Sequence, residues 1–145
     1  MSFFIDTSSL VKIYHKEENS QKVIDLYNSN ETIYISELAK IEFISTAYRK
    51  YREKEIIREA LIVLTDKFQD DVESRYKVLK FSSLVCDGAL DLLQNIGAKY
   101  GLRTLDSLQL AFFLTYCEKD DIFVCSDKQF ANVVQNKGFK ILLPG

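Results

Sequence analysis

The sequence predicts an α/β fold, namely a three-layer α/β/α sandwich with a mainly parallel central sheet. Short segments that are apolar along their whole length alternate with segments whose apolar residues recur at helical intervals. Strands of this kind are typical of a parallel sheet that helices cover on both faces. The chain has 145 residues, the size of one domain, so we predict a single domain over residues 1–145.

In the first half of the chain, an apolar strand is followed by two helical segments, a second strand and two longer helices. TIYIS is rich in β-branched and aromatic residues, which favours a strand. The helices are predicted because apolar residues return every three or four positions, for example Leu38, Ile41 and Ile44. In order, we predict strand 2–5, helices 8–14 and 19–29, strand 32–36, and helices 37–52 and 55–73.

The second half of the chain continues the alternation of strands and helices. YKVLKF alternates apolar with polar residues, Gly101 and Gly138 are placed to end helices, and Thr104 is placed to cap one. The helix that begins at Thr104 is apolar over most of its surface, so it should be deeply buried. In order, we predict strand 76–81, helices 83–101 and 104–119, strand 121–126, helix 127–138 and strand 139–143.

Composition and charge exclude several classes of protein. No apolar stretch reaches the roughly 18 residues that a membrane span needs, and the N-terminus lacks the features of a secretory signal. We therefore expect a cytoplasmic protein with no membrane partner. Cys86, Cys117 and Cys125 lack a paired spacing such as C-x-x-C, so we expect buried free thiols rather than zinc ligands. The net charge of -2 argues neither for nor against nucleic acid.

Four of the 21 acidic residues occupy positions where a carboxylate is unexpected. Asp6 and Asp127 directly follow predicted strands, and Glu42 interrupts the apolar part of its helix. Asp106 lies in the first turn of the most buried helix. Each has a structural explanation: capping for Asp6 and Asp127, the helix dipole for Asp106, and a solvent boundary for Glu42. However, the carboxyl ends of parallel strands meet at one edge of a sheet, so several of these carboxylates should share one cleft.

Such a cleft favours a bound metal, because like charges repel one another unless cations neutralise them. A ligand set of oxygens without thiolate or imidazole favours Mg²⁺ or Mn²⁺. One or two such ions suit the attack of water on a phosphodiester. The only histidine, His15, has no evident catalytic partner and is interpreted as the end of the first helix.

Four segments resemble, in order and spacing, the acidic blocks of the PIN domain family, in particular the VapC-type toxins of bacterial and archaeal toxin–antitoxin pairs. They are FFIDTSSLVKIY, SELAKIEFISTAYRK, GLRTLDSLQLAFF and IFVCSDKQFANVVQNKGFKIL, and the likeness that they mark extends over essentially the whole chain. The resemblance implies a PIN-like fold, a metal-dependent endoribonuclease that hydrolyses RNA, a small antitoxin partner and a homodimer. It also implies that four residues hold one or two Mg²⁺ or Mn²⁺ ions as the catalytic acids: Asp6, Glu42, Asp106 and Asp127.

The resemblance extends to hydroxyl residues beside these acids. Thr7 and Ser8 match the polar pair that fixes the first carboxylate and contacts the water shell of the metal. Ser126 matches a supporting hydroxyl residue beside the last acid. Ser107 and Gln109 depart from the family, which often carries alanine and histidine there, and this puts an auxiliary histidine contact in doubt.

A basic helix end provides a candidate RNA contact. YRKYREKEIIR packs Arg49, Lys50 and Arg52, with further basic residues, against Glu53 and Glu55. Two interpretations are open: a solvated face with ion pairs between successive turns, or a rim that contacts phosphates.

Three other classes of function fit the sequence less well. A non-catalytic PIN-like interaction module predicts the loss of an acid, which is not seen. A dehalogenase-type phosphoacceptor needs a second Asp where the chain has Ser8, and a receiver needs its acceptor at a later central strand, where YKVLKFSS offers none. A PIN nuclease of RNA processing or DNA flap cutting stays open, although the short chain favours the toxin.

Overall fold

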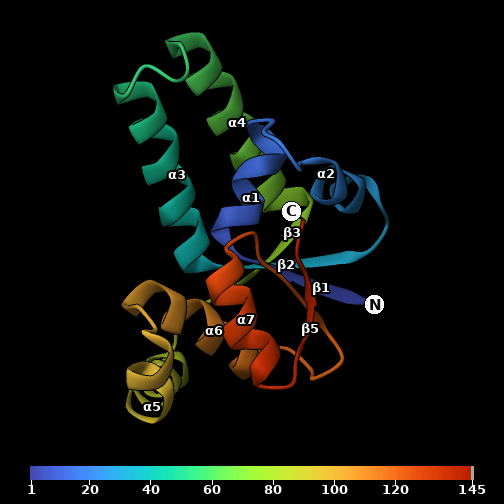
Figure 1. Cartoon of the computed structure of the whole chain (residues 1–145). Helices are drawn as coiled ribbons and strands as arrows, with labels where there is room; N and C mark the ends of the chain where they lie inside the picture. The colour runs from blue at the N-terminus through green and yellow to red at the C-terminus, as the bar shows by residue number, and fades with distance from the viewer. Residues whose placement is uncertain (145) are drawn as a thin grey trace.

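A single sheet of five parallel strands lies between two layers of helices (Figure 1). The computed structural model describes residues 1–144, and the strand order within them is β3-β2-β1-β4-β5. The strands are β1 (Ser2–Ile5), β2 (Thr32–Ser36), β3 (Tyr76–Leu79), β4 (Ile122–Val124) and β5 (Lys140–Leu142). The predicted three-layer α/β/α sandwich is therefore confirmed, with a sheet that is parallel throughout.

The helices divide between the two faces of the sheet. The first four pack with one hydrophobic core and the last three with the other, apart from Leu38 of the third helix, which contributes to the second core. The third and fourth form a long hairpin that extends beyond the sheet (Figure 1). The helices are α1 (Thr7–Tyr14), α2 (Gln21–Asn28), α3 (Glu37–Arg52), α4 (Arg58–Ser74), α5 (Ser83–Tyr100), α6 (Thr104–Tyr116) and α7 (Lys128–Asn136).

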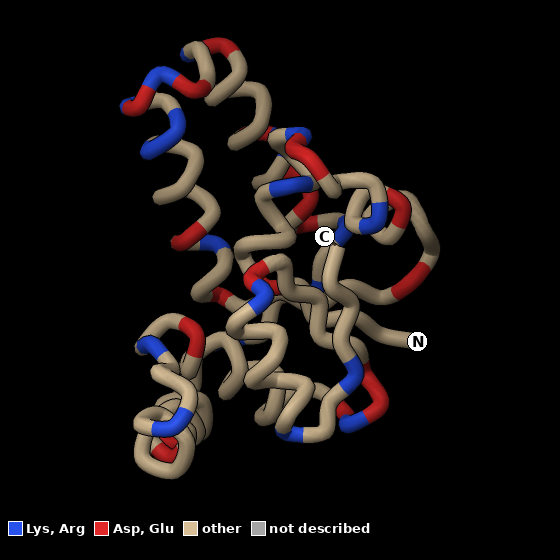
Figure 2. Tube along the Cα trace, viewed as in Figure 1, with Lys and Arg blue, Asp and Glu red and all other residues tan. Residues whose placement is uncertain are grey.

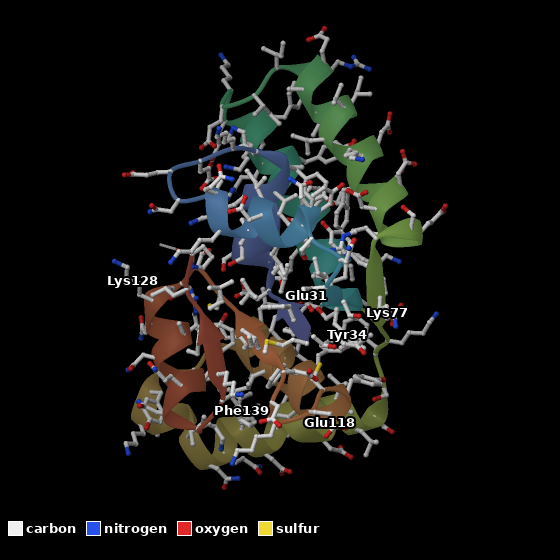
Figure 3. All side chains as sticks on the ribbon, turned by 90° about the vertical axis from the view of Figure 1, so that its right-hand side faces the viewer. Glu31, Tyr34, Lys77, Glu118, Lys128 and Phe139 are labelled. Carbon is white, nitrogen blue, oxygen red and sulfur yellow. The ribbon has the colours of Figure 1, made fainter. Side chains whose placement is uncertain are left out.

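Strand β1 is the centre of the sheet and joins the two cores. It pairs with β2 on one side and with β4 on the other, so that Phe4 lies opposite both Tyr34 and Phe123. Successive side chains of a strand point to opposite faces, and Phe4 and Ile5 accordingly lie fully buried in different cores. At the edge strand β3, Lys77 pairs with Tyr34 of β2 (Figure 3).

The seven predicted helices and five predicted strands are all present, but some of their boundaries differ. Helix α4 begins at Arg58 rather than at residue 55, because the backbone of its N-cap residue Ile57 is extended. The third strand ends at Leu79 rather than at residue 81. Thr104 is the first residue of α6 and not its cap, since Arg103 occupies the N-cap position.

The prediction for the cysteines is correct in part. All three are free thiols, but only Cys125 is buried. Cys117 is partly exposed to solvent and Cys86 is exposed. Helix α5 buries Val85 and Ala89, so Cys86, one residue further around the helix, faces solvent. Among residues 1–144, no helix is long and apolar enough to cross a bilayer.

Gly101 provides a test of the turn that leads into α6. It ends α5 with a φ of 62°, a left-handed backbone conformation that residues other than glycine adopt only at a cost in free energy. No atom lies within 4 Å of a Cβ built at Gly101, so Gly101→Ala should lower the free energy of unfolding by about 1 kcal/mol through backbone strain alone. Urea unfolding measures this change.

Gly97→Ala is the matched control, because Gly97 lies inside the same helix. A Cβ added there would lie 3.8 Å from the nearest atom, Leu93 Cδ2, which is an ordinary contact distance. This substitution should raise the free energy of unfolding by about 0.5–1 kcal/mol, since glycine is disfavoured within helices. Changes of the same sign at both positions would contradict the explanation.

Candidate active site

The four predicted acids lie around the carboxyl end of the sheet. Asp6 follows β1, and its backbone N–H donates to the Val124 carbonyl of β4 at 3.1 Å, which extends the pairing of these strands by one residue. Asp127 follows β4 after a two-residue connection, and Asp106 lies in the first turn of α6. Glu42 lies on α3, the helix that follows β2. The topology therefore brings all four to one region of the molecule.

Asp6 is a buried carboxylate that also caps a helix. Asp6 is only 5% exposed. Its Oδ1 accepts hydrogen bonds from the Ser9 backbone N–H at 3.3 Å and from the Ser8 hydroxyl at 2.7 Å. The pKa of Asp6 is raised to about 7, chiefly by burial and to a smaller extent by the nearby charge of Asp106, while the hydrogen bonds from Ser8 and Ser9 oppose the shift. Ionised Asp6 is therefore costly unless a positive charge lies close to it.

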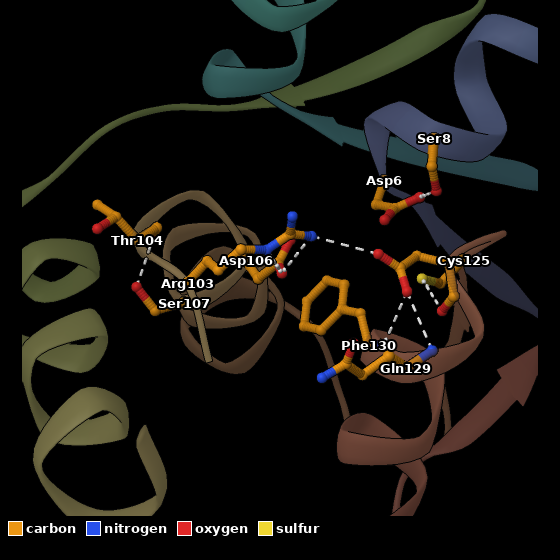
Figure 4. A network of polar contacts seen from close by, with 10 residues as sticks. Asp6, Ser8, Arg103, Thr104, Asp106, Ser107, Cys125, Gln129 and Phe130 are labelled. Atoms are coloured by element: carbon orange, nitrogen blue, oxygen red, sulfur yellow. Dashed lines mark hydrogen bonds and ion pairs between the residues drawn. The ribbon is translucent and has the colours of Figure 1, made fainter. Parts of the chain in front are cut away.

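Arg103 supplies a positive charge to the two other aspartates. Its Nη2 lies 3.1 Å from Asp106 Oδ2 and 3.3 Å from Asp127 Oδ2, and Figure 4 shows the side chain reaching across from the start of α6. Burial raises the pKa of Asp106, Arg103 opposes this shift, and Asp127 adds to it. One guanidinium thus balances part of the charge of two carboxylates.

Asp127 uses its two oxygens for different partners. Oδ1 accepts from the backbone N–H groups of Gln129 and Phe130 at 3.0 and 3.1 Å, which caps α7. Oδ2 points to Arg103. Capping and participation in a charged site therefore coexist in this residue.

Glu42 is held by neutral donors on the opposite side of the site. Its Oε1 accepts from the Thr7 hydroxyl and from the Gln109 side-chain amide, both at 2.9 Å. Gln109 is 3% exposed, also donates to Thr7 Oγ1 at 3.1 Å, and accepts from the Ser36 hydroxyl at 2.9 Å. The direction of the Glu42 carboxylate is thereby fixed from α1 and α6.

The hydroxyl residues predicted to support the site all lie in it, with roles that differ in detail. The Ser8 hydroxyl donates to Asp6 Oδ1, whereas the Thr7 hydroxyl donates to Glu42 and not to Asp6. The Ser126 backbone N–H donates to Ser8 Oγ at 3.1 Å, and the hydroxyls of Ser126 and Ser9 are 2.7 Å apart. Ser126 therefore ties the loop after β4 to the start of α1.

Sequence reasoning missed Arg103 and the positive role of Gln109. Arg103 precedes Asp106 by three residues, the spacing at which side chains meet on a helix, and this signal could have identified the pair. From the sequence, Gln109 stands out only as a departure from the histidine of the family. Its bonds join residues more than 60 positions apart in the sequence, so no local pattern shows them.

The basic helix end is heterogeneous. Lys50 is 8% exposed, and its ammonium group is 3.3 Å from Glu17 and 3.2 Å from Glu55. Arg49 is exposed and lines a pocket that Glu42 and Arg103 also line. Figure 2 shows acidic and basic residues interleaved at the turn between α3 and α4, where Arg52 is exposed. His15 is the C-cap residue of α1, as predicted.

The donor chemistry of the site suits a hard divalent cation. All four predicted ligands offer carboxylate oxygens, Asp6 is buried with a raised pKa, and a cationic group already contacts Asp106 and Asp127. As the side chains of residues 1–144 lie, no three acidic, histidine or cysteine residues form a ready ligand cluster. Glu42 faces Thr7 and Gln109. Arg103 contacts Oδ2 of both Asp106 and Asp127. The residues fit a metal ion by chemistry, and their side chains would have to adjust to hold it.

Comparison with protein families matches most of the chain to a known domain. The model described as PIN domain matches residues 3–135. Curated protein sequences give no match.

Solved structures of similar fold include two VapBC proteins and FitAcB. VapBC2 from Rickettsia felis, bound to a DNA fragment from its promoter, has a TM-score of 0.68 and 18% identity, over 99% of this chain and 98% of that one. DNA-bound VapBC from Salmonella typhimurium has the same score and identity, over 100% and 99%. FitAcB from Neisseria gonorrhoeae has a TM-score of 0.67 and 13% identity, over 99% and 98%. At these identities the likeness establishes the fold.

The raised pKa of Asp6 predicts how pH affects the metal-free protein. The pKa of Asp6 is about 4 in the unfolded chain and about 7 in the folded protein. Between these two pH values, Asp6 holds a proton in the folded protein that it has lost in the unfolded chain. The contribution of Asp6 to the free energy of unfolding should therefore fall as pH rises through this range. Asp6→Asn retains a capping oxygen and cannot ionise, so it should remove this part of the slope. Urea unfolding in EDTA at several pH values measures it, and equal slopes for both proteins would contradict the assignment.

The buried amide of Gln109 should stabilise the fold as well as orient Glu42. Gln109→Met keeps a similar shape but leaves the Ser36 hydroxyl without its buried acceptor, so the free energy of unfolding should fall by about 1–3 kcal/mol. Gln94→Met, at an exposed position of α5, should change it by less than about 0.5 kcal/mol. A double-mutant cycle with Ser36→Ala should show coupling of at least about 0.5 kcal/mol, and additive effects would rule out the link.

Proposed function

The chain belongs to the PIN domain family, whose model spans residues 3–135, and from this membership we propose that it is a metal-dependent endoribonuclease. It hydrolyses phosphodiester bonds of RNA with one or two Mg²⁺ or Mn²⁺ ions, and it acts in the cytoplasm as the VapC-type toxin of a toxin–antitoxin pair. The observation that carries the proposal is the meeting of Asp6, Asp106 and Asp127 at the carboxyl end of the sheet, where their charges perturb one another.

Asp6, Asp106 and Asp127 would hold the ion together with Glu42. A divalent cation bound there supplies an activated water and stabilises the charge that develops on the phosphate oxygens. Ser8 orients Asp6 through the bond to Oδ1, and the backbone N–H groups at the start of α7 orient Asp127. The bonds from α1 and α7 orient these two carboxylates before the ion and the substrate arrive.

Glu42 has a separate support. Thr7 and Gln109 both donate to its Oε1, so the carboxylate direction is set before substrate binds. Ser126 supports the site indirectly, by joining the loop that carries Asp127 to Ser8.

The RNA backbone would lie over the basic side of the pocket. Arg49 and Arg103 line one pocket with Glu42, Thr7 and Ser8. Arginine suits phosphate recognition because its guanidinium donates several hydrogen bonds in a fixed plane. Of the three basic residues predicted to contact RNA, Arg49 and Arg52 are exposed, whereas Lys50 is already paired with two glutamates.

The proposed partners follow from the family and from the similar structures. Two of those structures are VapBC proteins, and a further similar structure is a toxin–antitoxin complex from Klebsiella pneumoniae. This likeness supports a small antitoxin that binds this chain, and we also propose a homodimer. A PIN nuclease of RNA processing is the alternative for the same site. A non-catalytic PIN module is disfavoured because all four acids are present.

Removal of single acids or of the metal should abolish cleavage while the fold persists. Asp106→Asn, Asp127→Asn or Asp6→Asn should each reduce cleavage of a mixed RNA substrate by at least about a hundredfold, because each removes a charged ligand. Excess EDTA should have the same effect on the unmodified protein. Gel analysis of the RNA measures cleavage, and circular dichroism checks the fold.

Asp70→Asn is the matched control for these substitutions. It makes the same chemical change at an exposed position of α4 and should leave cleavage unaltered. Undiminished cleavage in EDTA would overturn the metal-dependent mechanism.

A further inference from the structure

Arg103 is the one basic residue within ion-pairing distance of the predicted metal-site acids in residues 1–144. It lines the pocket beside Asp127 and Phe130, the pocket beside Thr7 and Glu42, and the pocket between Glu42 and Asp106. The three hollows around the acids therefore meet at this side chain.

The guanidinium contacts the oxygens that a cation would use. Nη2 faces Oδ2 of both Asp106 and Asp127, and Oδ1 of Asp127 is already committed to capping α7. A divalent ion at Oδ2 and a guanidinium at the same atoms would repel each other. Only one of the two can occupy this position.

The side chain of Arg103 can move away from the two carboxylates. Its side chain is 72% exposed, and ion pairs of exposed side chains are weak. Its backbone is the N-cap residue of α6, so the side chain can swing away while the helix stays in place.

We propose that Arg103 is a positioning residue that competes with the divalent metal ion: it holds Asp106 and Asp127 together in the metal-free protein and must release them when the ion binds. This inference rests on the proposed metal-dependent function and deepens it. Arg103 lowers the affinity of the site for metal, and in exchange it keeps the carboxylates of α6 and of the loop after β4 from separating through repulsion.

The test is Mn²⁺ binding to the metal-free protein, measured by isothermal titration calorimetry and by electron paramagnetic resonance. Arg103→Ala should bind Mn²⁺ roughly tenfold more tightly than the unmodified protein, because two weak ion pairs no longer have to break. Arg103→Lys keeps the charge but lacks the planar fork, so its affinity should lie between those of the other two. Asp127→Asn should lose most of the binding.

Lys128→Ala is the matched control for charge. Lys128 directly follows Asp127, projects into solvent (Figure 3) and makes no ion pair within residues 1–144. Its removal changes the net charge equally and should alter the Mn²⁺ affinity by less than about twofold, since exposed charges are screened.

The possible failures are distinguishable. Equal or weaker Mn²⁺ binding by Arg103→Ala, or an equal gain for Lys128→Ala, would overturn the competition while leaving the metal-dependent nuclease intact. Absence of Mn²⁺ binding by all variants and by the unmodified protein would overturn both the competition and the proposed function.

Discussion

The pairing of β1 with both β2 and β4 is the constraint on which the site depends. Phe4 and Ile5 are fully buried on opposite faces of the sheet, so the register of this strand is fixed by two cores at once. A shift by one residue would exchange the faces of both side chains. Because the register is fixed, Asp6 must emerge at the carboxyl edge beside the end of β4, with the loop to Asp127 next to it.

The charges gathered at this edge are balanced in two different ways. Glu42 belongs to a buried network of neutral donors, in which Gln109 connects Ser36 at the end of β2 with Thr7 at the start of α1. Asp106 and Asp127 instead share an exposed guanidinium from Arg103. Buried neutral networks are rigid when every member is satisfied, whereas exposed ion pairs exchange readily. The site therefore has a fixed side and an adaptable side.

The order of strands and helices could be predicted from the sequence because each element carries its own periodicity. The placement of Asp6 and Asp127 at one edge of the sheet could be predicted because the carboxyl ends of parallel strands meet there. The starts of helices were harder to predict from the sequence. Thr104 has a side chain that suits a cap, yet the extended residue before the helix is Arg103. The exposure of Cys86 depends on which face of α5 meets α6, and the role of Gln109 depends on contacts with distant residues. These are properties of packing, which no local pattern contains.

A carboxylate that caps a helix and a carboxylate that binds a cation are often treated as alternatives, but the geometry of Asp127 separates the two roles by atom. Oδ1 receives two backbone N–H groups and Oδ2 faces the positive charge. The capping bonds fix the plane of the carboxylate and thereby aim the second oxygen. Capping at the end of a parallel strand is therefore a means of presenting a carboxylate to a cation, and Asp6, at the end of β1, likewise caps its helix, α1, through Oδ1.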